Sequence, residues 1–165
     1  MNLDATGINS HKELLYQDLN SGPVMVRIPH GIASGAKLTV SERTLYSDSF
    51  NENLSLDTAD AGNSFAFTWF DNDPVNNMHG DWIGIVNVDT TDANVDVFVS
   101  DMATPKISKT VGANGGLEIF QIPTTLTNGP VVVKTHDGTG GQKLVVSQRV
   151  IYKNSFNELM GRKQS

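Results

Sequence analysis

The chain of 165 residues contains no cysteine. This absence excludes disulfide frameworks, thiolate nucleophiles and cysteine-based zinc sites. Charged residues make up only 18% of the sequence, the formal net charge is -6, and the 12 basic residues are scattered along the chain. Because binding to a phosphate backbone needs clustered Lys and Arg, the composition argues against a nucleic-acid partner.

Long hydrophobic runs are also missing. No segment approaches the roughly 18–20 apolar residues of a membrane-spanning helix, so no membrane span is expected. The N-terminal sequence MNLDATGINS has neither the basic nor the apolar region of a secretory signal peptide. With 38% hydrophobic residues, however, the chain is apolar enough to fold around a core.

Short alternating or apolar segments, such as SFAFTWF, DWIGIVNV and ANVDVFVS, follow one another about every ten residues. Turns rich in Asn, Asp and Gly separate them. This spacing predicts an all-β fold, an antiparallel β-sandwich of jelly-roll or immunoglobulin-like type. The expected strands cover residues 65–70, 82–88, 94–100, 106–111, 117–121, 130–135 and 142–152. A short helical turn is expected near residues 155–160.

A phrase of eighteen residues occurs twice. Residues 35–52 (GAKLTVSERTLYSDSFNE) and 141–158 (GQKLVVSQRVIYKNSFNE) are identical at eleven positions. Weaker matches upstream extend the repeated unit to about forty residues. The chain therefore divides into an N-terminal arm (1–12), a half-module repeat (13–53), a full β-sandwich module (54–161) and a tail (162–165).

Two interpretations of this half-module are open. In one, the two copies pack together within a single closed monomer. In the other, the half-module contacts a neighbouring chain head to tail, and such contacts form fibres when they do not close. The N-terminal arm, with the apolar anchors Leu3, Ala5 and Ile8, could add a strand to a sheet edge.

The repeated phrase has its own predicted chemistry. An Arg among apolar neighbours needs a carboxylate partner, and the Glu nine residues later could return to it after a turn. The Tyr would pack beside this corner and the Phe would close the end of the core. The alternative is that the phrase forms a docking surface between modules. Its residues are Ser41, Arg43, Tyr46, Phe50, Asn51 and Glu52 in the first copy, and Ser147, Arg149, Tyr152, Phe156, Asn157 and Glu158 in the second.

The order WFD, WIGIVNV, ANVDV, NGPVVV and SQRVIYKNSFNE resembles a β-sandwich module repeated in large bacterial cell-surface proteins. The ending SQRxxYxxSFNE is its distinctive part. The resemblance covers residues 67–161 as a whole unit and 21–52 as a half, so the chain begins within a module. It implies an extracellular or cell-surface location and a structural or adhesive role, with no catalytic residues.

Two candidate ligand sites stand out. Asp71, Asp73 and Asp81 offer hard oxygen ligands that would suit calcium, although their spacing does not match an EF-hand and a solvated loop is the competing interpretation. No other cofactor is expected. Trp69 and Trp82 are either core residues, which their apolar neighbours favour, or a stacking surface for sugar rings, which would make a polysaccharide the partner.

Catalytic signatures are absent from the sequence: it has no H-E-x-x-H, no G-x-S-x-G and no P-loop. None of the four histidines has a zinc partner at suitable spacing. We therefore expect a non-enzymatic, extracellular structural protein that assembles with itself through module contacts or strand addition, as a filament or surface-layer subunit. A carbohydrate-binding or adhesion module is the alternative, and a hydrolase is a third, weaker one.

Overall fold

The structure is a computed structural model, and it describes residues 23–26, 39–46, 49–72, 78–123, 125–126, 128–136, 142–153 and 155–164. The chain divides into two compact units, Met1–Val40 and Ser41–Ser165. In the first unit, residues 23–26 are exposed and belong to no strand. The predicted N-terminal arm, with Leu3, Ala5 and Ile8, lies outside the described residues.

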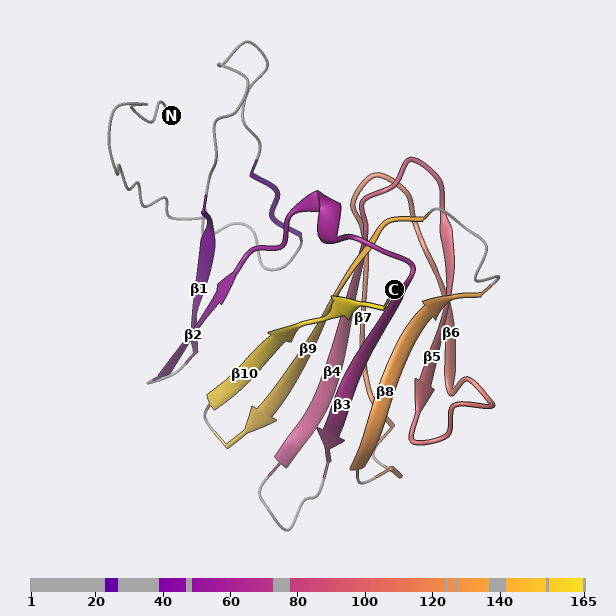
Figure 1. The fold of residues 1–165 in the computed structure, drawn as a ribbon. Helices are drawn as coiled ribbons and strands as arrows, with labels where there is room; N and C mark the ends of the chain where they lie inside the picture. The colour runs from indigo at the N-terminus through magenta and orange to yellow at the C-terminus, as the bar shows by residue number, and fades with distance from the viewer. Residues whose placement is uncertain are drawn as a thin grey trace, which may run out of the picture. The chain divides into compact units, whose positions relative to one another are not determined.

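The second unit is built from antiparallel strands, as predicted (Figure 1). Two large sheets pack against each other as a β-sandwich. One sheet has the order β10-β9-β4-β7. Its strands are β4 (Met78–Asn87), β7 (Gly116–Gln121), β9 (Leu144–Tyr152) and β10 (Ser155–Met160). The other sheet has the order β11-β3-β8-β5-β6. Its strands are β3 (Ser64–Asp71), β5 (Ala93–Val99), β6 (Ile107–Val111), β8 (Asn128–Thr135) and β11 (Arg162–Lys163).

A separate two-stranded sheet precedes the sandwich in the chain. It is the hairpin of β1 (Ser41–Tyr46) and β2 (Ser49–Leu54). A single 3-10 turn, η1 (Thr58–Asp60), lies in the connection to β3. Among the described residues there is no helix of the length and apolarity needed to cross a membrane.

The core lies between the two large sheets. Because side chains alternate along a strand, every second residue of the central strands points inward. Val95, Val97 and Val99 of β5 share the buried face, as their spacing predicts. The other buried members of this cluster come from both sheets and their connections: Phe65, Phe67, Phe70, Ile83, Ile85, Ala93, Val111, Ile122, Val131, Val133, Leu144 and Val146.

Each of the seven strands expected between residues 65 and 152 corresponds to one strand from β3 to β9. The expected helical turn near residues 155–160 is wrong, because Ser155–Met160 is strand β10. It pairs antiparallel with β9, from Ser155 opposite Tyr152 to Met160 opposite Ser147. Pairing with β9 therefore outweighs any local preference of this short segment for a turn.

The end of the chain crosses from one sheet to the other. β10 belongs to the four-stranded sheet and β11 to the five-stranded sheet, with Gly161 between them. A Cβ atom at Gly161 would lie 3.0 Å from the Phe67 ring and 3.1 Å from the carbonyl oxygen of Val146. A side chain at this position would be tightly packed, because the crossing backbone lies directly on the core.

Candidate functional site

The repeated phrase folds into the same hairpin twice. In the second copy Arg149 pairs with Glu158 across β9 and β10, and the guanidinium Nη2 lies 2.6 Å from the carboxylate Oε2. In the first copy Arg43 pairs with Glu52 across β1 and β2, with the same two atoms 2.5 Å apart. The Arg–Glu pair predicted from the sequence is thus present in both copies.

The Phe of the phrase completes this arrangement. The Arg43 guanidinium lies 4.9 Å from the centre of the Phe50 ring, and that of Arg149 lies 4.6 Å from the Phe156 ring. The prediction that these rings close the end of the core is wrong. Phe156 stands opposite Ile151, on the same face of the hairpin as Arg149, whereas the core side of β9 carries Val146 and its alternate neighbours.

The remaining residues of the phrase have different roles in the two copies. The Ser41 hydroxyl donates a 2.9 Å hydrogen bond to Glu52. The bonds from Arg43 and then Ser41 hold the pKa of the Glu52 carboxyl below its usual value. The equivalent Ser147 lies opposite Gly84 of β4 in the backbone ladder between β9 and β4. The Tyr46 side chain lies outside the described part of the structure, and Tyr152 is exposed.

The two hairpins also meet each other. β2 lies beside β10, and the Asn51 side-chain amide donates a 3.2 Å hydrogen bond to the side-chain oxygen of Asn157. Asn51 and Asn157 are the same position of the repeated phrase. The contact therefore joins equivalent residues of two similar units, which is the form that a two-fold contact takes between identical units.

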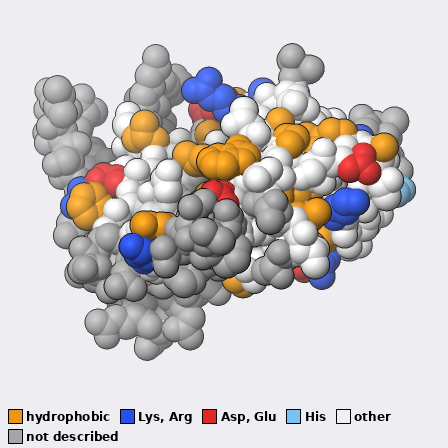
Figure 2. All heavy atoms as spheres, turned by 90° about the horizontal axis from the view of Figure 1, so that it is seen from below, with side chains coloured by type: hydrophobic (Ala, Val, Ile, Leu, Met, Phe, Trp, Pro, Cys, Tyr) orange, Lys and Arg blue, Asp and Glu red, His pale blue; other side chains and the backbone are white. Residues whose placement is uncertain are grey.

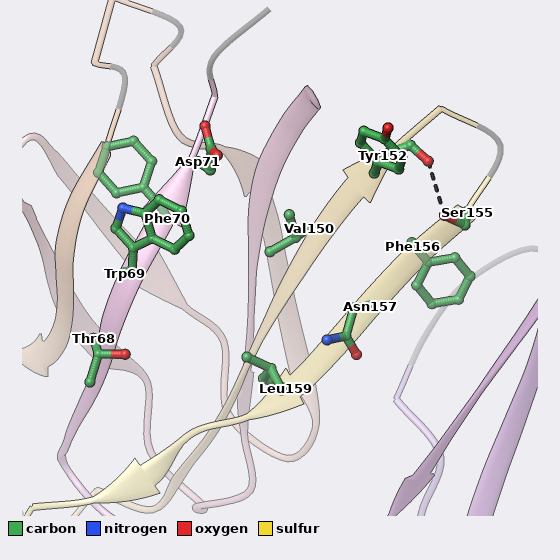
Figure 3. A pocket seen from close by; sticks show the side chains of 10 residues that line it. All are labelled: Thr68, Trp69, Phe70, Asp71, Val150, Tyr152, Ser155, Phe156, Asn157 and Leu159. Carbon is green, nitrogen blue, oxygen red and sulfur yellow. Dashed lines mark hydrogen bonds between the residues drawn. The ribbon is translucent and has the colours of Figure 1, made fainter. Parts of the chain in front are cut away.

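A groove of about 360 Å³ lies between β3 and the β9–β10 hairpin (Figure 3). The Ser155 hydroxyl closes the hairpin turn by a 3.0 Å hydrogen bond to the Tyr152 carbonyl. Trp69 and Phe70 come from the β3 side, and Tyr152, Asn157 and Leu159 come from the hairpin. The full lining is Thr68, Trp69, Phe70, Asp71, Val150, Tyr152, Ser155, Phe156, Asn157 and Leu159.

Trp69 is exposed over 58% of its surface, so the expectation that it is a core residue is wrong. The cause is an irregularity in β3: its pairing with β8 shifts register between Phe67 and Phe70, and both of these rings stay buried. The extra residue of such a bulge reverses the alternation and re-aims a side chain. The sequence carries no evident signal for this bulge.

Trp82 belongs to a different surface. It is half-buried on β4, opposite Arg149 of β9 and Gln121 of β7. Its neighbours Asp81 and Ile83 are fully buried, so alternation places Trp82 on the other face of the sheet. The structure therefore does not bring Trp82 and Trp69 into one site.

The acidic residues predicted for calcium do not form a described cluster. Asp81 is fully buried on β4, Asp71 ends β3, and Asp73 lies outside the described residues. Within the ranges that the structure describes, no three His, Cys, Asp or Glu side chains are grouped as metal ligands. Calcium binding stays a prediction.

Asp81 instead belongs to a buried polar network. Gln148 donates 2.7 Å and 2.8 Å hydrogen bonds to the Asp81 carboxyl and the Trp69 carbonyl, and the Asn72 side-chain oxygen accepts one from the Asp81 backbone at 2.8 Å. Burial raises the pKa of Asp81 to about 7, and the bond from Gln148 opposes this only in part. Asp81 Oδ1 and Gln148 Oε1 are buried without a hydrogen-bond partner among the described residues.

A third polar group lies on the outer face of the five-stranded sheet and was not predicted. Buried Asp96 of β5 accepts a 2.6 Å hydrogen bond from Ser108 of β6, and it lies 2.8 Å from the Nδ1 atom of His136. Ser108 thus bonds to the carboxylate and not to the imidazole, so this is not the order of a hydrolytic triad. The alternating polar residue in NVDVFV is the one sequence signal that points to it.

Comparison with known proteins finds no matching family model, no matching curated protein and no matching solved structure.

Proposed function

We propose that the protein is a non-enzymatic structural protein that associates with itself through contacts between modules. The observation that carries this proposal is the β1–β2 hairpin. It has the strand pairing, the Arg–Glu pair and the Arg–Phe contact of the β9–β10 hairpin. In the described structure, however, no counterpart of β4 pairs with β1, whereas β4 pairs with β9 along most of its length.

The hairpin accordingly leaves apolar side chains in water. Leu45, Phe50 and Leu54 are exposed over 75%, 60% and 67% of their surfaces. Their counterparts in the second copy, Ile151, Phe156 and Met160, are all half-buried. These side chains stay exposed although β2 contacts β10 within the chain, and exposed apolar groups favour association because covering them removes apolar area from water. Hydrophobic side chains also gather near the middle of the face drawn in Figure 2.

The proposed setting is the cell surface. It is supported by the resemblance of the SQRxxYxxSFNE ending to modules of large bacterial surface proteins. On this proposal the partner is another copy of the chain, and the assembly is a filament or a surface layer. The described residues contribute strand edges and apolar side chains to it.

Sedimentation velocity over a hundredfold range of protein concentration tests the proposal. We expect species larger than the 17.8 kDa chain that grow with concentration. The variant Leu45→Ser/Phe50→Ser/Leu54→Ser should shift the distribution back to the single chain. A matched control is Met102→Ser/Ile119→Ser, which changes exposed apolar residues elsewhere. A single 17.8 kDa species at every concentration would contradict the proposal.

A second function is favoured by the exposure of Trp69. The groove places Trp69 and Tyr152, the latter exposed over 41% of its surface, beside the polar side chains of Ser155 and Asn157. Aromatic faces next to a few hydrogen-bonding groups suit a sugar ring. We propose polysaccharide binding as this alternative.

A glycan array tests the alternative directly. We expect binding that is lost in Trp69→Ala and retained in Trp82→Phe, because Trp82 lies on the other face of its sheet. Unchanged thermal unfolding of Trp69→Ala would show that the loss is local. Failure of the unmodified protein to bind any polysaccharide on the array would exclude this function.

A further inference from the structure

We propose that β10 is a docking site for the β1–β2 hairpin, and that in an assembly this hairpin docks on β10 of a second copy. A single chain makes the same contact within itself. The inference rests on the proposed function and deepens it, because it names the segment that is exchanged and the strand that receives it.

The contact seen within the chain is the first observation. Asn51 of β2 donates its hydrogen bond to Asn157 of β10, and these residues are equivalent in the repeat. A contact between equivalent residues of two similar hairpins means that this surface of the repeat is self-complementary. The site that receives the hairpin in one chain is therefore present, with the same residues, in every other copy.

The second observation is that both strands end their sheets. β10 is the terminal strand of the four-stranded sheet, and β2 is paired with β1 alone among the described strands. The two strands lie side by side without forming a ladder with each other. Edge strands present unpaired backbone groups that recruit further strands. Because no backbone ladder joins β2 to β10, this contact can open without breaking a sheet.

The third observation is the hinge. Behind the hairpin the chain is fixed again at η1, where the Lys163 ammonium donates a 2.6 Å hydrogen bond to the Ala59 carbonyl. The Asp60 backbone also donates a 2.8 Å bond to Asp57. Between Leu54 and Asp57 only Ser55 and Leu56 remain, and neither belongs to a strand or turn. Rotation about these two residues would carry the hairpin away from its own β10.

The length of this hinge also fixes the character of the assembly. Three residue steps from Leu54 to Asp57 span at most about 11 Å. A hairpin docked on a second copy would therefore hold the two sandwiches close together. Exchange would make a compact joint between neighbours, not a flexible tether.

The hairpin needs such a receiving surface in either arrangement. A two-stranded hairpin is at best marginally stable alone in water. Docking on β10 supplies contacts that β1 and β2 lack by themselves. The competition between the two arrangements is set by concentration, because the contact is the same in both.

The absence of cysteine allows a sharp test in the full chain. Asn51→Cys and Asn157→Cys are prepared as separate variants, one carrying a mass tag, then mixed at high concentration and treated with a short thiol cross-linker. We expect the mixed pair to cross-link at least tenfold more than Asn51→Cys mixed with Lys109→Cys. Lys109 is exposed on β6, away from the proposed contact, so that pair reports random collision. Equal cross-linking of the two mixtures would overturn the proposal.

The double variant Asn51→Cys/Asn157→Cys gives the second measurement. At low concentration we expect cross-linking within single chains, and at high concentration a growing share of cross-links between chains. Cross-linking within chains at every concentration would overturn the exchange. If sedimentation still shows large species in that case, self-association stands and a different surface makes it. If sedimentation shows only single chains, the proposed function fails as well.

Discussion

Gln148 donates a 2.7 Å hydrogen bond to the buried carboxyl of Asp81. The equivalent residue in the first copy of the repeat is Glu42. Gln148 is buried between β9 and β4, whereas Glu42 is exposed on β1. The difference follows from β4. In the second copy, β4 lies beside β9, and the neutral amide of Gln148 bonds to the buried acid Asp81. In the first copy, no such strand is described beside β1, and the charged Glu42 faces water.

The first prediction concerns pH and Asp81. Its pKa is about 7 in the folded protein against an ordinary value of 3.8, so the folded chain retains a proton that the unfolded chain releases. The contribution of Asp81 to the free energy of unfolding is therefore full below about pH 4 and is lost as the pH rises to about 7. Three pH units correspond to at most about 4 kcal/mol.

The measurement is denaturant unfolding of the unmodified protein and of Asp81→Asn from pH 4 to pH 8. Asn keeps an oxygen that can accept the bond from Gln148 and cannot ionise. We expect the stability of Asp81→Asn relative to the unmodified protein to increase across this range. Asp60→Asn, at an exposed position, should show no such trend. A constant difference between Asp81→Asn and the unmodified protein would mean that Asp81 is ionised throughout.

The second prediction compares the two ion pairs. Arg149 and Glu158 lie in the sandwich, and the Glu158 side chain is exposed over only 17% of its surface. Glu158→Gln should lower the free energy of unfolding by about 1 kcal/mol, because it leaves the half-buried guanidinium without its carboxylate. Glu52→Gln changes the equivalent exposed pair and should leave the melting temperature of the sandwich unchanged. Equal effects of the two substitutions would show that burial does not distinguish the pairs.

The third prediction concerns the crossing at Gly161. Gly161→Ser should destabilise the protein by about 1–3 kcal/mol, because the added atoms meet the Phe67 ring and the Val146 carbonyl. The equivalent residue after the first hairpin is Ser55, which is exposed. Ser55→Gly is the matched control and should change the melting temperature little. A stable Gly161→Ser protein would show that the crossing can move away from the core.

The fourth prediction separates the core from the exposed apolar residues. Phe65→Ala removes a fully buried ring that lies in the shared cluster of both sheets, and it should cost about 3–5 kcal/mol. Leu45→Ala removes an exposed side chain and should leave the stability of the sandwich unchanged. Urea unfolding followed by tryptophan fluorescence measures both, since Trp69 and Trp82 lie in the sandwich.

Much of the fold follows from local pattern. Alternation in NVDVFV places three valines inward, and strands separated by turn residues predict the sandwich. The Arg–Glu pair was also predictable, because a turn between the two residues brings them opposite each other. These features depend on periodicity and on charge pairing within one hairpin, both of which a sequence displays.

The candidate site was less predictable because it depends on register and on contacts between distant segments. The bulge that exposes Trp69 is one extra residue in β3, and residue types alone do not reveal it. Strand β10 was missed because its pairing with β9 decides its conformation. The bond between Gln148 and Asp81 joins residues that are far apart in the sequence, and only the neighbouring placement of β9 and β4 brings them together.

The pairing of β11 with β3 has a mechanical consequence. Gln164 donates a 2.8 Å backbone bond to Ser64, so the chain leaves the sandwich beside the point where it enters. Tension applied between these two points would peel β11 from β3 one hydrogen bond at a time, starting at Gln164. Behind β11, the crossing at Gly161 lies against the core and would resist next. Under a pulling force the chain would therefore lengthen first by the few residues of β11, while the core between the two sheets stays intact.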